Sequence, residues 1–267
     1  MRSSNPVMAS LTSDGTQSQG VPGGFQEQSY NQAQAEPTRP MTVDDVVTKT
    51  GITLAVIIAF ALVNFAVATF INPGVAMILT FVGGIAGFMT VLVAAFAKKW
   101  GSPVVTLIYA VCEGLFVGGF SLLLSGWFED DKQAVAIIGQ AILATIGVFI
   151  GMLFVYKTGA VRVTPKFRKV LTGMIMGVAV LALGNLLLAL FFGMSPLRDG
   201  GPLAIIFSIV CIVLASLSFL NDFDESDRLI RAGAPANYAW GVALGLAVTL
   251  VWLYTEILRL LSYFQNR

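Results

Sequence analysis

Histidine is absent from this chain of 267 residues, and charged residues make up only 12% of it. Without histidine the protein lacks the usual imidazole base, proton shuttle and metal ligand, which excludes intramembrane proteases that depend on that residue. The chain has no phosphate loop of the Gly-x-x-x-x-Gly-Lys type, and no Gly-x-Gly-Asp pattern or lysine falls inside an apolar run. These absences argue against an aspartyl protease, a retinal protein, and enzyme chemistry or a resident cofactor in general.

What the chain has in quantity is apolar sequence, with 56% hydrophobic residues and a mean hydropathy of +0.81. A helix needs about 20 residues to cross about 30 Å of hydrocarbon, and seven apolar runs are of that order. They cover residues 52–71, 75–97, 103–127, 135–156, 170–194, 203–220 and 240–261. We therefore predict an all-α membrane protein, a bundle of seven transmembrane helices in a lipid bilayer. The net charge of +1 gives no indication of a nucleic-acid partner.

The first forty or so residues have a different composition, dominated by Ser, Gly, Gln, Asn and Pro. Such a segment buries too little apolar surface to offset its ordering entropy, and it has no signal-peptide pattern. We expect residues 1–41 to form a disordered tail and residues 42–267 to form the membrane domain. Thr42 followed by Asp45 predicts a capped helix start.

The cations predict an orientation, because short loops rich in Lys and Arg remain cytoplasmic. With the N-terminus inside, the outer connections hold only Lys132 and Arg198. The inner connections hold Lys98, Lys99, Lys157, Arg162, Lys166, Arg168, Lys169, Arg228 and Arg231. We expect a multi-pass protein of the plasma membrane with a cytoplasmic N-terminus, although Arg259 and Arg267 near the other end oppose this orientation.

Glu113 is the most informative residue, because it lies near the middle of the apolar run 103–127. A carboxylate within a membrane span is a functional hypothesis by default. The alternative is a protonated Glu113 that is hydrogen-bonded to Gln140 or Asn185 on neighbouring helices.

Further carboxylates follow the sixth run, and Glu256 lies late in the seventh. Oxygen ligands suit protons and hard cations such as Ca²⁺, and two carboxylates in low dielectric would share a proton. Simpler interpretations exist, since Glu256 could pair with Arg259 on the next turn. The cluster after the sixth run contains Asp222, Asp224, Glu225 and Asp227, of which the last three could be a solvated loop face.

Glycines four residues apart predict close helix packing in lipid. The pairs are Gly83/Gly87, Gly114/Gly118, Gly147/Gly151, Gly173/Gly177 and Gly241/Gly245.

Three short motifs carry a family resemblance. Residues 220–224, Leu-Asn-Asp-Phe-Asp, and residues 253–261, Leu-Tyr-Thr-Glu-Ile-Leu-Arg-Leu-Leu, resemble the two acidic motifs of the Bax inhibitor-1 family. The last helix of that family typically reads Leu-Tyr-Leu-Asp-Phe/Tyr-Ile-Asn-Leu-Phe. Residues 109–121, Tyr-Ala-Val-Cys-Glu-Gly-Leu-Phe-Val-Gly-Gly-Phe-Ser, are similar to its Glu-Gly-x-x-x-Gly segment. Residues 42–264 fit the family's seven-span outline, and the details are most similar to its bacterial YccA-like branch, which implies a bacterial inner membrane.

The resemblance implies six helices around a central last helix, with a pH-sensitive Ca²⁺ leak gated by an aspartate pair between the sixth and seventh helices. Carried over by position, Asp222 and Glu256 would form that pair. Two features depart from the family pattern. Glu256 stands where the family has an aspartate, and the connection from Asp222 to Glu256 is about ten residues longer than is usual in the family. A helix that starts at Trp240 would carry Glu256 about 24 Å along its axis. An alternative register puts Thr249 at the acidic position and removes the pair.

The resulting hypothesis is a cation path, closed near neutral pH by a proton-sharing contact of Asp222 with Glu256. Glu113 would hold Ca²⁺ or H⁺ midway along it; Asp224, Asp227 and Arg259 are secondary candidates. The alternative is a non-conducting regulatory protein that binds a membrane protease or other membrane complex through its tail and residues 157–169. A coupled transporter is disfavoured, because no inverted repeat is evident.

Overall fold

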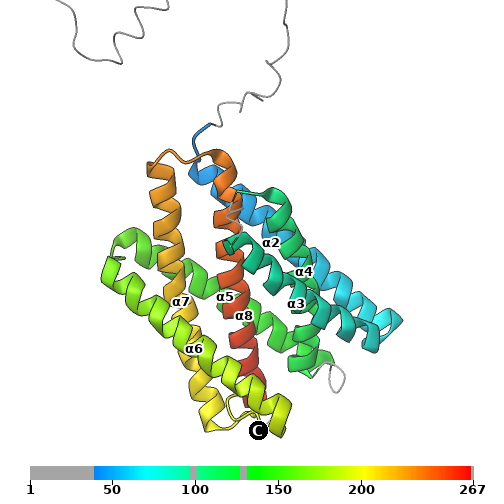
Figure 1. Ribbon diagram of the computed structural model, residues 1–267. Coiled ribbons are helices and arrows are strands. Elements are labelled where there is room, and N and C mark those ends of the chain that lie inside the picture. The colour runs from blue at the N-terminus through cyan, green and yellow to red at the C-terminus, as the bar shows by residue number, and fades with distance from the viewer. Residues whose placement is uncertain (1–38, 97–100, 127–130, 266–267) are drawn as a thin grey trace, which may run out of the picture. The chain divides into compact units, whose positions relative to one another are not determined.

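A computed structural model of the chain describes residues 39–96, 101–126 and 131–265 (Figure 1). Within these ranges the chain is helical apart from short turns and one isolated β-bridge. The elements are α2 (Val43–Ala66), the π-helical η1 (Val67–Ile71), α3 (Pro73–Phe96), α4 (Pro103–Ser125), α5 (Asp131–Thr158), α6 (Pro165–Phe192), α7 (Pro202–Arg231), the 3₁₀ turn η2 (Ala236–Tyr238) and α8 (Ala239–Gln265).

Seven of the described helical segments are long and apolar enough to cross a membrane, which confirms the predicted seven-helix membrane bundle. The first of these spans joins α2 and η1, Val43–Ile71. Almost all of the expected tail, and the cations Lys98 and Lys99, lie outside the described residues.

The apolar runs underestimate the lengths of several helices, because caps and ion pairs extend the helices beyond their apolar parts. Thr42 caps α2 through the predicted capping box with Asp45, so α2 begins nine residues before the run at residue 52. The largest correction concerns α7, which continues to Arg231 instead of ending near Leu220. Cations in the last turn of a helix interact favourably with its dipole, and both Arg228 and Arg231 lie there. Asp222 and the acids after it are therefore on a helix and not on a loop.

The last helix is the central one, as predicted. In its apolar window, 67% of the residues are buried, against 6% for α6. Figure 1 shows α8, in red, running between α7 and the α2–α4 side of the bundle. It packs mainly against α2, α4, α5 and α7, whereas α3 packs on α4 and α6 on α7. The expected ring of six is therefore an inner layer of four helices with two peripheral ones.

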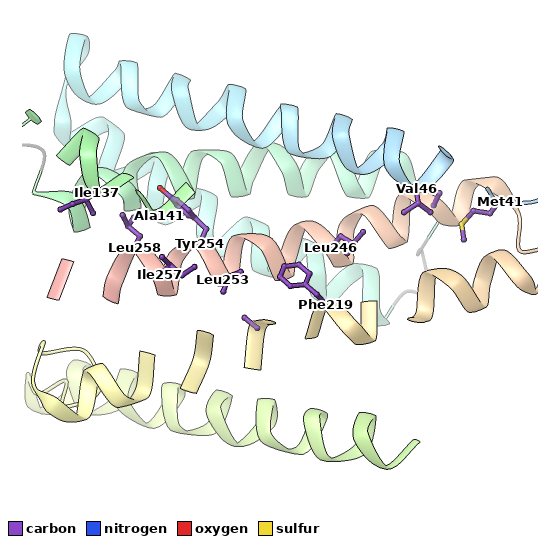
Figure 2. Close-up of a cluster of buried hydrophobic side chains, with 12 residues drawn as sticks. Met41, Val46, Ile137, Ala141, Phe219, Leu246, Leu253, Tyr254, Ile257 and Leu258 are labelled. Carbon is purple, nitrogen blue, oxygen red and sulfur yellow. The ribbon is translucent and has the colours of Figure 1, made fainter. Parts of the chain in front are cut away.

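The core that fixes α8 is an apolar cluster shared with α5 and α7 (Figure 2). Leu253 and Leu258 of α8 are fully buried, as is Phe219 of α7. Phe219 meets the ring of Phe149 edge-on at 5.3 Å. Because lipid tails are as apolar as these side chains, close packing and not water exclusion must hold the helices together.

The predicted glycine contacts form in one half of the bundle only. A Cβ on Gly118 would lie 2.4 Å from the backbone oxygen of Ala61, and one on Gly83 would lie 2.5 Å from that of Cys112. The α2–α4 and α3–α4 contacts thus require glycine. Open space surrounds the corresponding positions in the other half, namely Gly147, Gly151, Gly173 and Gly177. These glycines do not mediate helix contacts within the described chain.

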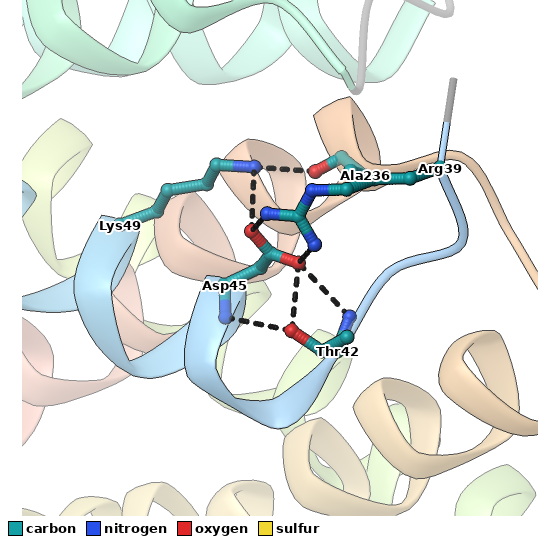
Figure 3. A network of polar contacts seen from close by, with 5 residues as sticks. All are labelled: Arg39, Thr42, Asp45, Lys49 and Ala236. Carbon is teal, nitrogen blue, oxygen red and sulfur yellow. Dashed lines mark hydrogen bonds and ion pairs between the residues drawn. The ribbon is translucent and has the colours of Figure 1, made fainter. Parts of the chain in front are cut away.

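The start of α2 is fastened to the turn between α7 and α8. The amide of Met41 donates to the carbonyl of Ala234 at 2.8 Å, and the amide of Ala236 donates to that of Arg39 at 3.0 Å. Figure 3 shows the side chains that complete this contact. The carboxylate of Asp45 accepts both guanidinium hydrogen bonds of Arg39, at 2.7 and 2.8 Å, and Lys49 donates to the carbonyl of Ala236.

Candidate functional site

Asp222 lies at the interface of α7 and α8, where it accepts a hydrogen bond from the hydroxyl of Thr249 at 2.7 Å. The two helices form an antiparallel hairpin, in which residues equally far from the turn face each other. Asp222 precedes the last residue of α7 by nine positions, and Thr249 follows the first residue of α8 by ten. Within the described residues no cation pairs with Asp222.

Glu256 has different partners, and the expected contact of Asp222 with Glu256 is not formed. Its carboxylate accepts a 2.6 Å bond from the guanidinium of Arg259 and a 3.3 Å bond from the hydroxyl of Ser208. Seven residues of helix separate Glu256 from Thr249, a rise of about 10 Å. The long connection places Thr249 opposite Asp222, so the alternative register is the one that the structure adopts.

The Glu256–Arg259 pair is itself a buried feature of the bundle, since the residues are 4% and 6% exposed. The guanidinium carbon of Arg259 lies 5.4 Å from the ring centre of Phe120 on α4. The pair therefore connects α8 to α7 through Ser208 and to α4 through Phe120.

Glu113 projects from α4 into a cavity of about 670 Å³ bounded by α3, α4 and α8. Gly87 of α3 provides the space, since a Cβ there would lie 2.8 Å from Oε2 of Glu113. No hydrogen bond or ion pair joins Glu113 to any residue in the described part of the chain. The two residues that the sequence analysis suggested as hydrogen-bond partners of Glu113 do not hydrogen-bond to it. Asn185 accepts from the amide of Leu197 at 2.9 Å, and the side chain of Gln140 is exposed.

The acids in the last turns of α7 form ion pairs. Asp224 and Glu225 both accept from Arg168 of α6. Asp227 accepts from Arg231 and, at 3.2 Å, from the hydroxyl of Tyr156 on α5. These residues tie α5 and α6 to α7, which is a structural role that the loop interpretation did not predict.

Asn64 is a buried polar residue that the sequence analysis did not single out. Its amide donates to the hydroxyl of Thr80 at 2.9 Å and to the carbonyl of Leu115 at 2.6 Å. It thereby joins α2, α3 and α4 beneath the cavity of Glu113. An asparagine within the apolar run 52–71 was the signal that could have identified it.

A second cavity, of about 610 Å³, lies between α2, α4, α5 and α8. Its walls are aliphatic and aromatic, and the hydroxyls of Ser121 and Tyr254 hydrogen-bond to each other across 2.8 Å. No charged side chain lines it.

Two acids thus lie on different flanks of α8, Asp222 with Thr249 on the α7 flank and Glu113 on the α3–α4 flank. No group of three or more His, Cys, Asp or Glu side chains is close enough to hold a metal ion among the described residues.

Comparison with known proteins agrees with this architecture. A search of curated proteins found no match. The family model described as Bax inhibitor 1 like matches residues 5–266, nearly the whole chain. The seven spans agree with this match, and the chain belongs to the Bax inhibitor 1 like family.

Proposed function

We propose that the protein is a proton-controlled cation leak channel of the Bax inhibitor-1 type, with Ca²⁺ as the permeant ion. The observation that carries this proposal is the placement of Asp222, which faces the central helix and whose partner among the described residues is a neutral hydroxyl, that of Thr249. The choice of Ca²⁺ follows from the family and from the affinity of carboxylate oxygens for hard cations.

Protonation changes the contact between α7 and α8. An ionised Asp222 accepts from Thr249, as in the structure. A protonated Asp222 can donate instead, and the Thr249 hydroxyl then donates to the carbonyl of Gly245, which lies 3.2 Å away. One charge disappears and the direction of the hydrogen bond reverses, at the interface of the two helices that form the hairpin. This gate responds to one proton, whereas a pair of acids would respond through two coupled titrations.

Glu113 and Glu256 have supporting roles in the proposal. Glu113 binds the permeant cation or a proton on the other flank of α8, because it faces a cavity and has no partner among the described residues. Glu256 is held by Arg259 and Ser208, so it stabilises the packing of α8 and is not a partner of Asp222.

Flux measurements on variants of Asp222 test the gate. In Ca²⁺-dye-loaded liposomes between pH 6 and 8, Asp222→Asn should remove the pH response of the leak, while the exposed-acid control Glu225→Gln should retain it. Thr249→Asp places a second acid opposite Asp222. The pH response of the leak should then become broader and show two steps. An unchanged pH profile in Asp222→Asn would overturn the gate.

The alternative, a non-conducting regulatory membrane protein, is favoured by a different observation. Residues 39–41 are bonded to the α7–α8 turn, so a partner that pulled on the tail would act directly on the hairpin that carries Asp222. Such a regulator, which could act on a membrane protease, should require the tail or residues 157–169 and tolerate Glu113→Gln. The channel should show the reverse.

The proposed location is the inner membrane of a bacterium, with the N-terminus in the cytoplasm, as in the YccA-like branch of the family. The support is the distribution of cations between the connections.

A further inference from the structure

The cavity of Glu113 has aromatic walls that an inorganic cation would not use. The rings of Phe116 and Phe120 stack along α4 with their centres 5.1 Å apart. The remaining aromatic side chains of the lining come from both neighbouring helices and include Phe81, Phe88 and Trp252. One carboxylate among several aromatic faces is the lining expected of a site for an organic cation.

The polar groups of the lining narrow the choice of ligand. The hydroxyl of Thr80 donates to Ala76 and accepts from Asn64, and that of Thr255 donates to Trp252. Glu113 is the charged side chain of the cavity, and in the described chain it has no hydrogen-bond or ion-pair partner. The hydroxyl of Tyr109 and the indole N–H of Trp252 are the other polar lining groups. The site therefore offers a ligand one acidic side chain and few further polar contacts.

As a site for a stably bound ligand, and not for an ion in passage, this donor set fits an ammonium better than a metal ion. Ca²⁺ requires six to eight oxygen ligands, and the cavity has a single carboxylate and three hydroxyls. An organic ammonium needs one charge-assisted hydrogen bond, and its apolar body can contact the aromatic rings. A cavity of about 670 Å³ has room for a ring and a short alkyl chain.

The cavity is accessible from the side of the bundle. Phe81, Ile85 and Phe88, which line it, are 60%, 67% and 63% exposed. They lie within a predicted span, Pro73–Phe96, so their exposed faces meet lipid. Amphipathic amines partition into bilayers and would approach from there.

We propose that the cavity between α3, α4 and α8 binds a hydrophobic organic cation with a single ammonium group, paired with Glu113 and packed against the aromatic walls. This site does not depend on the proposed leak, because a protein that conducts nothing would still bind the amine.

Equilibrium binding to the purified full-length protein tests the proposal. The probe is 4-(4-bromophenyl)butylamine, whose bromine should quench the fluorescence of Trp252, and the Trp252→Phe variant provides the background. The neutral alcohol 4-(4-bromophenyl)butan-1-ol has nearly the same shape and the same apolar body but carries no charge. Loss of a charge-assisted hydrogen bond corresponds to about tenfold or more in affinity, so the alcohol should bind at least that much more weakly.

Substitutions in and outside the cavity give the controls. Glu113→Gln should raise the Kd of the amine about tenfold or more, while Glu225→Gln should leave it unchanged. Phe88→Leu should weaken binding about threefold or more through the lost ring, and Phe96→Leu, on the same helix but outside the lining, should not.

Phe88→Leu keeps the test valid if Glu113→Gln does not fold. Equal affinity for amine and alcohol, or equal Kd in Phe88→Leu and Phe96→Leu, would overturn the proposal. A protein that binds the amine but shows no ion flux would refute the leak alone.

Discussion

Asp222 meets a hydroxyl across the α7–α8 interface and not a second acid. A neutral donor stabilises the ionised carboxylate without a cation, so the interface holds one proton-binding group with one partner. The residue that sequence comparison paired with it, Glu256, is occupied by Arg259. The long α7–α8 connection decided this outcome, because it places Thr249 opposite Asp222 and leaves Glu256 seven residues further along α8.

Removal of the Thr249 hydroxyl tests the importance of this hydrogen bond. Thr249→Val keeps the shape of the side chain but leaves the carboxylate without its donor, which should lower the free energy of unfolding by about 1–3 kcal/mol. Thr145→Val is the control, because that buried hydroxyl donates only to Ala141 on its own helix. Equilibrium unfolding in bicelles measures both, and equal losses would show that the contact contributes nothing specific.

The buried Glu256–Arg259 pair predicts a larger effect. Glu256→Gln leaves the guanidinium of Arg259 buried without a counter-charge, which should cost about 3–5 kcal/mol of unfolding free energy. The exposed Glu225→Gln should cost about 1 kcal/mol or less. In the double variant Glu256→Gln/Arg259→Met, most of the stability should return. If the double variant is as unstable as Glu256→Gln, the charge explanation is wrong.

Sequence alone indicated which acids occupy unusual positions, but it did not indicate their partners. Glu113 and Glu256 stand out because acids are rare within apolar runs, and Asp222 stands out because it closely follows one. Their partners depend on the lengths of helices and turns, to within one residue. The end of α7 was therefore the decisive error, since a hydrogen bond with α5 and ion pairs with α6 extend this helix past its apolar part.

At the scale of helices, the bundle has a tight half and a loose half. Glycine–backbone contacts hold α2, α3 and α4 together, whereas α6 is almost unburied and touches mainly α7. The pattern of glycines four apart does not distinguish the two halves, because Gly114/Gly118 and Gly173/Gly177 look alike in sequence. The difference arises from which helix lies opposite.

Alanine substitutions separate these two classes of glycine. Gly118→Ala places a methyl group against the backbone of Ala61 and should cost about 1–3 kcal/mol or more, because a backbone cannot move aside. Gly177→Ala meets open space and should be neutral or stabilise the helix by up to about 1 kcal/mol. Unfolding measurements on both variants check this prediction. Similar losses at the two positions would contradict the packing of α4 against α2.

At the scale of the whole molecule, composition determined the fold class and hydropathy determined the number of spans. The central position of the last helix followed from the family resemblance, and burial of α8 confirms it. The two cavities beside α8 could not be predicted, because their walls come from three or four helices each, some of which are far apart in the sequence.

The cations predict the orientation of this bundle. Reporter fusions to the C-terminus should show it on the side opposite the N-terminus, because seven spans cross the membrane. With the positively charged connections inside, a C-terminal periplasmic reporter should be active and a cytoplasmic one inactive. The reverse pattern would place the contact between the start of α2 and the α7–α8 turn on the outer side of the membrane.

The most direct test of the leak itself is Ca²⁺ flux into dye-loaded liposomes that contain the purified protein, measured from pH 6 to 8. We predict flux above that of empty liposomes, a pH dependence that Asp222→Asn abolishes, and a strong decrease in Glu113→Gln. Flux no greater than that of empty liposomes, or flux indifferent to both substitutions, would contradict the channel and favour the regulatory protein.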